Sequence, residues 1–485
     1  MLKKIIQISG IGRYLNYQVK NGPAWDSNLK KINIIYAPNG SGKTTLSTIL
    51  KSLSSFDSKY VELKKTFNSE IEQYVKILTD DNSTIELKGG IWSNHNLNME
   101  VLDILFIEDY LYSGSIHNKQ NKLNLYKLLT GEKGAVLSNR FRECKNKYNT
   151  AISRLKNVRR NNITDRIEEI EENAKTATAD LNNVIHQIDE IAKTVFTKHI
   201  ELSNKYLLRF APYIKFDRFE FERLDDNSKK LRLKLLIEVH GEKISFTTPT
   251  LTYTSHSAKL TLSEGDKSAI ALCFFLARLE LIGTTDKIIV FDDPLSSFDH
   301  GRKLTTINTL AKIAKECEQF FLLTHDLYFA RDFTEKVSDS NPLNLKIEND
   351  GTTSLICSHD IYLDTLTSLE KDLQIISSYL KNEVSSDIER RDIIRCIRPA
   401  LEGVLRSKYF ELFSAYDWLG DMISKIRQSS SSSRLNKLKV ILDDISELND
   451  FSKSYHHSSL KTNDIINPFE LKKYVTLLME TIDKI

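Results

Sequence analysis

The stretch Ala37-Pro38-Asn39-Gly40-Ser41-Gly42-Lys43-Thr44 has the spacing of a phosphate-binding loop, with alanine in the first glycine position. The apolar run at residues 31–36 predicts a buried strand before it, and a helix is expected from Lys43. Backbone N–H groups in the loop and the positive end of the helix dipole would hold phosphates. Lys43 would reach the terminal phosphates, and the Thr44 hydroxyl would bind Mg²⁺. The expected nucleotide contacts are Pro38, Asn39, Gly40, Ser41, Gly42, Lys43, Thr44 and Thr45. The alternative is a glycine-rich turn without a ligand.

Two aspartates follow a second buried run, residues 287–291. Asp292 ends this expected strand, where a carboxylate would meet the Mg²⁺ held by Thr44, directly or through water. Asp293 comes next and would orient the attacking water as a catalytic base. The alternative is that Asp293 is only an anion behind the metal site.

Three further segments occur in a fixed order. Residues 262–267 (Leu-Ser-Glu-Gly-Asp-Lys) open a predicted helix and resemble the signature motif of ABC-type and SMC-type ATPases. Residues 292–299 resemble the Walker B segment and D-loop of these ATPases, and residues 323–326 (Leu-Thr-His-Asp) resemble their switch-histidine segment. Taken alone, the first segment could be a plain helix cap.

This resemblance implies a specific arrangement. Ser263 and Gly265 of one subunit would close over ATP held by another, so two ATP molecules would be sandwiched in a homodimer, with His325 in the catalytic site. Asp293 stands where most such ATPases have glutamate, which implies slow hydrolysis. No glutamine loop is evident after Ile107, and Asp109 or Gln120 could take its place.

Heptad spacing dominates the middle of the chain and predicts an antiparallel coiled-coil hairpin, turning near residues 159–162. The alternative is two ordinary amphipathic helices in a bundle. The seam positions are Leu137, Phe141, Cys144, Tyr148, Ala151, Leu155 and Val158 in the first arm, and Ile163, Ile167, Ile170, Ala174, Ala177, Leu181, Val184, Ile188, Ile191 and Val195 in the second. Residues 133–160 hold nine Lys and Arg but one acidic residue. The positive charge of this first arm predicts ion pairs with the second arm or, alternatively, nucleic-acid binding.

Composition excludes several classes of protein. The chain has 485 residues, of which 40% are apolar and 27% charged, as expected for a globular protein of two to four domains. Its five cysteines form no Cys-x-x-Cys pair, which argues against a structural zinc site or a disulfide framework. No apolar run approaches the roughly 18–20 residues of a membrane span. We therefore expect a cytoplasmic protein with no membrane partner.

These observations predict an α/β fold: an ABC/SMC-type P-loop ATPase head with an inserted short antiparallel coiled-coil hairpin, followed by an all-α C-terminal domain. The expected domains are an N-terminal head lobe at 1–132, the hairpin at 133–200, a C-terminal head lobe at 201–360 and a helical effector domain at 361–485. The expected cofactors are ATP and Mg²⁺.

The motifs also resemble the PrrC/RloC group of bacterial ATPases. The resemblance rests on Ile-Gly-Arg-Tyr at 11–14, Tyr-Ala-Pro-Asn-Gly-Ser-Gly-Lys-Thr-Thr at 36–45, Leu-Ser-Glu-Gly-Asp-Lys-Ser-Ala at 262–269 and Phe-Asp-Asp-Pro-Leu-Ser-Ser-Phe-Asp at 291–299. That group contains tRNA anticodon nucleases of phage defence, and it implies a metal-independent nuclease after the switch histidine. Arg398 and Glu402 have the i, i+4 spacing for such a site, and His456 and His457 follow. The alternative is a surface ion pair and a polar helix end.

Two functions from different classes follow. The first is an ATP-gated tRNA nuclease, whose partners would be tRNA or another nucleic acid and a second copy of the chain. The second is a regulatory ATPase that resembles the PtuA component of Septu defence systems and controls a nuclease on a separate chain. A DNA-repair role is a weaker third interpretation, because the arms are short. Residues 364–485 hold 18 basic and 19 acidic residues, so this domain has no overall positive charge for RNA.

Overall fold

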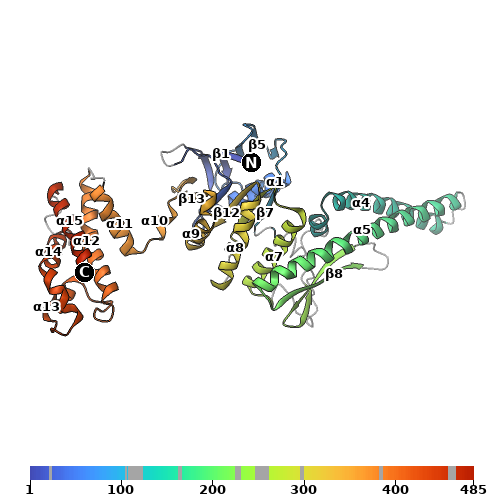
Figure 1. Cartoon of the computed structure of the whole chain (residues 1–485). Helices are drawn as coiled ribbons and strands as arrows, with labels where there is room; N and C mark the ends of the chain where they lie inside the picture. Colours follow the sequence, from blue (N-terminus) through green and yellow to red (C-terminus); the bar gives the residue numbers. More distant parts are fainter. Residues whose placement is uncertain are drawn as a thin grey trace. The chain divides into compact units, whose positions relative to one another are not determined.

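The computed structural model describes residues 1–20, 25–103, 106, 124–161, 166–223, 231–245, 261–294, 300–381, 386–456 and 466–485. The chain divides into two compact units, Met1–His359 and Asp360–Ile485. Figure 1 colours the second unit orange to red. None of the helices in these ranges is long and apolar enough to span a membrane.

A six-stranded sheet forms the centre of the first unit. Its strand order is β14 (Ser354–Ser358), β13 (Leu343–Asn349), β3 (Ile32–Tyr36), β12 (Gln319–Thr324), β11 (Ile288–Asp292) and β7 (Met99–Leu102). All neighbouring strands are parallel except β14, which pairs antiparallel with β13. The three central strands, β3, β12 and β11, are buried along almost their whole length, as expected for parallel strands covered on both faces, and every residue of β12 is buried.

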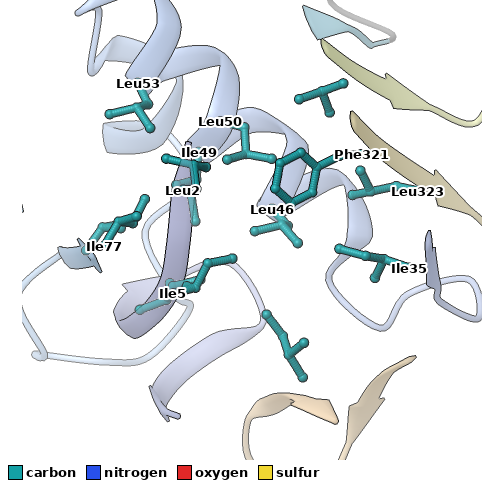
Figure 2. Packing of buried hydrophobic residues seen from close by; sticks show 14 of the residues in the cluster. Leu2, Ile5, Ile35, Leu46, Ile49, Leu50, Leu53, Ile77, Phe321 and Leu323 are labelled. Carbon is teal, nitrogen blue, oxygen red and sulfur yellow. The ribbon is translucent and has the colours of Figure 1, made fainter. Parts of the chain in front are cut away.

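A second, antiparallel sheet has the order β2 (Tyr14–Gln18), β1 (Leu2–Ile11), β4 (Tyr74–Thr79), β5 (Thr84–Lys88) and β6 (Ile91–Trp92). Helix α1 (Lys43–Ser55) shares one hydrophobic core with both sheets. Figure 2 shows Leu46, Ile49 and Leu50 of α1 among Leu2 of β1 and Phe321 of β12. This packing fixes the start of α1 against the carboxyl ends of the parallel strands.

Three helices accompany the parallel sheet in the first unit: α7 (Glu264–Ile282), α8 (His300–Glu316) and α9 (Leu327–Lys336). Helix α7 is buried on all sides over residues 269–277. A three-stranded antiparallel sheet of β8 (Ile214–Arg223), β9 (Leu231–Val239) and β10 (Glu242–Ser245) precedes α7 in the sequence. Short helical turns occur at α2 (Lys59–Glu62) and η3 (Ser338–Ser340).

Helices α4 (Asn124–Arg160) and α5 (Ile167–Phe210) run side by side and pack against each other (Figure 1). Every predicted seam position within the described ranges is buried or half-buried, and Leu181, Val184 and Ile188 are almost fully enclosed. Near the turn, Arg159 Nη2 and Glu171 Oε1 form an ion pair of 2.7 Å between the arms. Helix α5 continues past residue 200 because its last turns pack on α7 and β8.

The second unit is helical throughout its described residues. It contains α10 (Ile361–Thr365), α11 (Ser368–Lys381), α12 (Asp387–Lys408), α13 (Leu419–Gln428), the 3₁₀ helix η4 (Arg434–Ile441), α14 (Leu442–His456) and α15 (Pro468–Lys484). These helices enclose one apolar core of their own, which includes Ile397, Leu401 and Leu405 of α12. Helix α12 packs against both α14 and α15.

Candidate functional site

The loop between β3 and α1 is held in a tight turn. Ser41 Oγ donates to the Pro38 carbonyl at 2.7 Å, and the Ser354 hydroxyl donates to the Ser41 carbonyl at 2.6 Å. Gly42 precedes the helix at φ 109°, and a Cβ there would lie 3.0 Å from Ser354 Oγ and 3.1 Å from a ring carbon of Tyr14. Only glycine fits this position, because both the backbone angle and the space exclude a side chain.

The predicted nucleotide contacts differ in exposure. Pro38, Asn39, Gly40 and Thr44 are exposed, whereas Ser41, Gly42, Lys43 and Thr45 are buried. Thr45 packs closely against Gly12. A Cβ added to Gly12 would lie 2.5 Å from Thr45 Oγ1. The exposed members therefore form the open side of the loop, and the buried members anchor it.

Lys43 meets both aspartates at the carboxyl edge of the parallel sheet. Its Nζ lies 3.3 Å from Asp292 Oδ1 and also pairs with Asp293 Oδ2. The side chains of Lys43 and Asp292 are only 9% and 5% exposed. The contact arises because β3 and β11 are parallel strands whose carboxyl ends lie at the same edge, where ligands bind in α/β sheets.

Ser47 is a site residue that sequence reasoning missed. Its hydroxyl donates to Asp292 Oδ2 at 2.5 Å and is buried one turn after Lys43 on α1. Thr44, predicted to share Mg²⁺ with Asp292, has an exposed side chain at the first turn of the same helix. The i, i+4 spacing from Lys43 was the available signal, since residues so spaced share a helix face.

Asp293 and His325 form a second contact across neighbouring strands. Asp293 Oδ1 accepts hydrogen bonds from the His325 backbone N–H at 3.0 Å and lies 2.9 Å from His325 Nδ1. Asp293 has φ 48°, a left-handed conformation that Asp tolerates better than most residues. With Asp293 ionised, the short contact requires the proton on Nδ1, which directs the other ring nitrogen away from the carboxylate.

A third carboxylate at this edge of the sheet is Asp103, which the sequence analysis did not predict as a site residue. Leu102 of β7 pairs with Phe291 of β11, so Asp103 follows directly beside Asp292. Asp103 Oδ1 lies 3.0 Å from Lys51 Nζ, and burial raises the pKa of this carboxyl. Lys51 stands one turn beyond Ser47, so a single face of α1 presents residues 43, 47 and 51 to three carboxylates. Asp109 and Gln120, considered for the glutamine loop, lie outside the described residues.

Lys64 adds a further cation to this edge. Burial lowers the pKa of its ammonium group, while Asp292 and Asp103 act in the opposite direction. Its backbone carbonyl accepts from the Gly12 N–H at 2.6 Å, which fastens this segment to the start of the chain.

Residues of the predicted signature motif begin α7. Ser263 is exposed and caps the helix, since its Oγ accepts from the Asp266 N–H at 3.1 Å while Asp266 Oδ2 accepts from the Ser263 hydroxyl at 2.8 Å. Asp266 also accepts from the hydroxyl of Tyr213. Gly265 is buried in the first turn. The segment thus has the geometry of a helix cap, and its contact with ATP on a second copy stays a prediction. Residues 295–299 of the predicted D-loop lie outside the described residues.

The donor set fits Mg²⁺ as bound in phosphate-transfer sites. Among the described residues no group of three or more His, Cys, Asp or Glu side chains is placed to hold a metal alone. Mg²⁺ is usually bound by one or two carboxylates together with substrate phosphates and waters. Asp292 and Thr44, at the phosphate-binding loop, would supply the protein ligands, and the bound ion would neutralise phosphate charge.

The predicted nuclease residues lie in the second unit. Arg398 Nε is 3.0 Å from Glu402 Oε1 on one face of α12. The same oxygen accepts from the Leu419 N–H at 2.8 Å, so Glu402, at 7% exposure, ties α12 to the start of α13. This gives Glu402 a structural task, and its catalytic role stays a prediction. His456 is the last residue of α14, though its side chain and all of His457 lie outside the described part of the chain.

Comparison with known proteins shows the family of the chain. A family model for an AAA domain, AAA_13, matches residues 138–457. The chain is also 30% identical, over 103 residues, to the uncharacterized chromosomal cassette SCCmec type IVc protein CR006 of Staphylococcus aureus strain MRSA252. That match covers 19% of this chain and only 15% of the relative's length.

Solved structures of SMC head domains are also similar. The Smc head of Pyrococcus furiosus, with an extended coiled coil and bound to the C-terminal domain of ScpA, is 13% identical with a TM-score of 0.37, covering 78% of this chain and 99% of that one. The SMC head domain from Thermotoga maritima is 12% identical with a TM-score of 0.29, covering 74% and 100%.

Proposed function

The chain belongs to the AAA_13 family of AAA-domain proteins, and from this premise we propose that it hydrolyses ATP to switch a C-terminal effector. The observation that carries the proposal is the meeting of Lys43, Asp292 and Asp293 at the sheet edge beside the phosphate-binding loop. A lysine at this edge, next to N–H groups at a helix start, is suited to binding phosphates, and the two carboxylates beside it suit the accompanying Mg²⁺ and the attacking water.

Each residue has a definite chemical task in this proposal. Lys43 and the loop N–H groups bind the phosphates, and Asp292, oriented by Ser47, faces the Mg²⁺ position. Asp293 is the base for the attacking water, while His325 holds its Oδ1 and fixes its orientation. Phosphate draws Lys43 away from Asp293, so Oδ2 becomes able to accept a proton. ATP binding would therefore itself activate Asp293 as the base.

The test is Asp293→Ala in the full-length protein. We expect retained ATP binding, and single-turnover hydrolysis slowed by ~10²–10⁴, the usual contribution of a general base. Asp286→Ala is the matched control, because Asp286 lies at the opposite end of β11, bonded to Lys287 at 2.9 Å. Unchanged hydrolysis in Asp293→Ala would show that the base lies elsewhere. ATP should also close a homodimer through Ser263 and Gly265, which would appear as an increase in molecular mass in solution. The dimer should persist longer in Asp293→Ala, because this variant hydrolyses ATP slowly.

For the effector we propose ATP-gated cleavage of tRNA in phage defence, as the resemblance to the PrrC/RloC group implies. Support comes from Arg398, whose guanidinium lies 5.8 Å from the Trp418 ring near the surface, and from α14, which packs on α12 and ends at His456. Arg398 would stabilise charge on the phosphate, and a histidine would transfer protons.

Cleavage of tRNA without a metal ion distinguishes this proposal from a metal-dependent nuclease. Purified protein with tRNA in EDTA should yield 2′,3′-cyclic phosphate and 5′-hydroxyl ends. Arg398→Ala and the His456/His457 double substitution should stop cleavage while ATP binding persists. Arg395→Ala is the control, because Arg395 lies one turn earlier on α12 and pairs with Asp392.

A second candidate is a regulatory ATPase that controls a nuclease on a separate chain. The structural task of Glu402, which bonds the backbone of Leu419, favours this candidate. Intact tRNA with the purified protein, followed by cleavage once a partner chain is added, would select it.

A further inference from the structure

The loop between α12 and α13 exposes three aromatic side chains. Phe410 is 69% exposed, Tyr416 89% and Trp418 65%, all within residues 409–418, which we call the aromatic loop. Large exposed apolar groups gathered in one place mark interaction sites more often than scattered ones do.

The aromatic loop is held in a defined shape. Two of its own residues, Tyr409 and Phe413, are buried in the helical core and anchor the loop. Asp417 Oδ2 accepts from the Ser414 N–H at 2.7 Å and lies 2.5 Å from Lys425 Nζ, while the Asp417 carbonyl accepts from Arg406 at 2.9 Å. A loop fixed in this way presents its aromatic rings with little further loss of conformational entropy on binding.

Positive charge is concentrated in the stretch of sequence that contains the loop. Residues 398–439 contain eight Lys and Arg and four Asp and Glu, whereas the rest of residues 364–485 contains ten and fifteen. The near-zero charge of the whole segment therefore conceals a basic region. Cations lie against the loop itself: Arg398 is 5.8 Å from the Trp418 ring, and Arg434 is 5.6 Å from the Tyr409 ring.

We propose that the aromatic loop is a stacking platform for single-stranded RNA. Aromatic rings beside a basic surface bind single strands because every base has a face that stacks and every linkage carries a negative charge. The positive surroundings favour a polyanion over an apolar protein partner. This inference deepens the proposed function by naming where the RNA docks, and it rests on that function only for the choice of RNA over DNA.

The test uses the full-length protein and a fluorescein-labelled single-stranded RNA of roughly ten nucleotides, within the ~4–16 nucleotides typical of such sites. Fluorescence anisotropy at low salt should give about tenfold weaker binding for Tyr416→Ala and for Phe410→Ala, while Trp418→Phe keeps most of the affinity. Phe469→Ala is the matched control, since Phe469 is 83% exposed but lies on α15. Matching thermal melting curves should accompany each variant.

The outcomes separate this proposal from the nuclease proposal. Weaker binding confined to the loop variants supports the platform, even when the RNA is never cut. Equal binding by wild type and loop variants overturns it, even when cleavage continues. Failure of the wild type to bind the strand also overturns it. So do loop substitutions that alter the oligomeric state of the protein but leave RNA binding unchanged. A single-stranded DNA of the same length that binds better than RNA would reject RNA as the occupant.

Discussion

Replacement of Ser47 by alanine should weaken the use of Mg²⁺ without abolishing ATP binding. The Ser47 hydroxyl donates to Asp292 Oδ2 at 2.5 Å in a buried position, so the variant removes a hydrogen bond to a charged acceptor. Such bonds contribute about 1.5–3 kcal/mol. Groups that orient a metal ligand typically change metal affinity ~10–100-fold, which agrees with about 1.4 kcal/mol for each factor of ten.

The assay is the Mg²⁺ concentration that gives half-maximal ATP hydrolysis. We expect this concentration to rise at least about tenfold in Ser47→Ala and to return toward wild type in Ser47→Thr, which restores the hydroxyl. ATP binding in EDTA should be unchanged, because Lys43 and the loop remain.

A matched control lies on the same helix. Thr48 is buried like Ser47, but its hydroxyl donates to the Thr44 carbonyl at 2.6 Å and not to a carboxylate. Thr48→Val should leave the Mg²⁺ requirement near wild type. An unchanged requirement in Ser47→Ala, or an equal rise in Thr48→Val, would refute the argument that Ser47 orients Asp292.

Three other perturbations test the same structure. Lys43→Ala should abolish ATP binding in equilibrium dialysis, and undiminished affinity would contradict the assignment of the loop. Lys51→Met should cost about 3 kcal/mol in urea unfolding, because it leaves the buried Asp103 carboxylate without the cation 3.0 Å away. Burial lowers the pKa of His199 to about 3 from 6.5, so the unfolded chain binds a proton that the folded chain does not. Stability should therefore fall by about 1.4 kcal/mol between pH 7.5 and 5.5, and His199→Gln should remove this loss.

The local parts of the site could be predicted from sequence because each depends on neighbouring residues. The loop at 37–44 needs glycine where the backbone turns sharply, and its flanking strand and helix follow from apolar runs. The start of α7 was predictable for the same reason, since Ser263 caps the helix within one turn. The seam of α4 and α5 follows from a spacing that repeats along the chain.

Contacts between distant segments could not be predicted in this way. The pairing of Lys43 with Asp293 depends on the order of β3, β12 and β11 in the sheet, which no local pattern encodes. Glu402 was predicted to form a catalytic pair with Arg398, with a surface ion pair as the alternative, and neither interpretation included its bond to Leu419, which arises from the approach of α13.

The sequence by itself thus determined the chemistry available at the phosphate-binding loop and the period of each helix, because these depend on backbone angles and on residues within a few positions. Only the tertiary structure decided that Ser47 and Asp103 join Asp292 and that the aromatic loop is exposed. Burial and proximity arise when strands and helices far apart in the chain pack together, and side-chain spacing along one element does not contain that information.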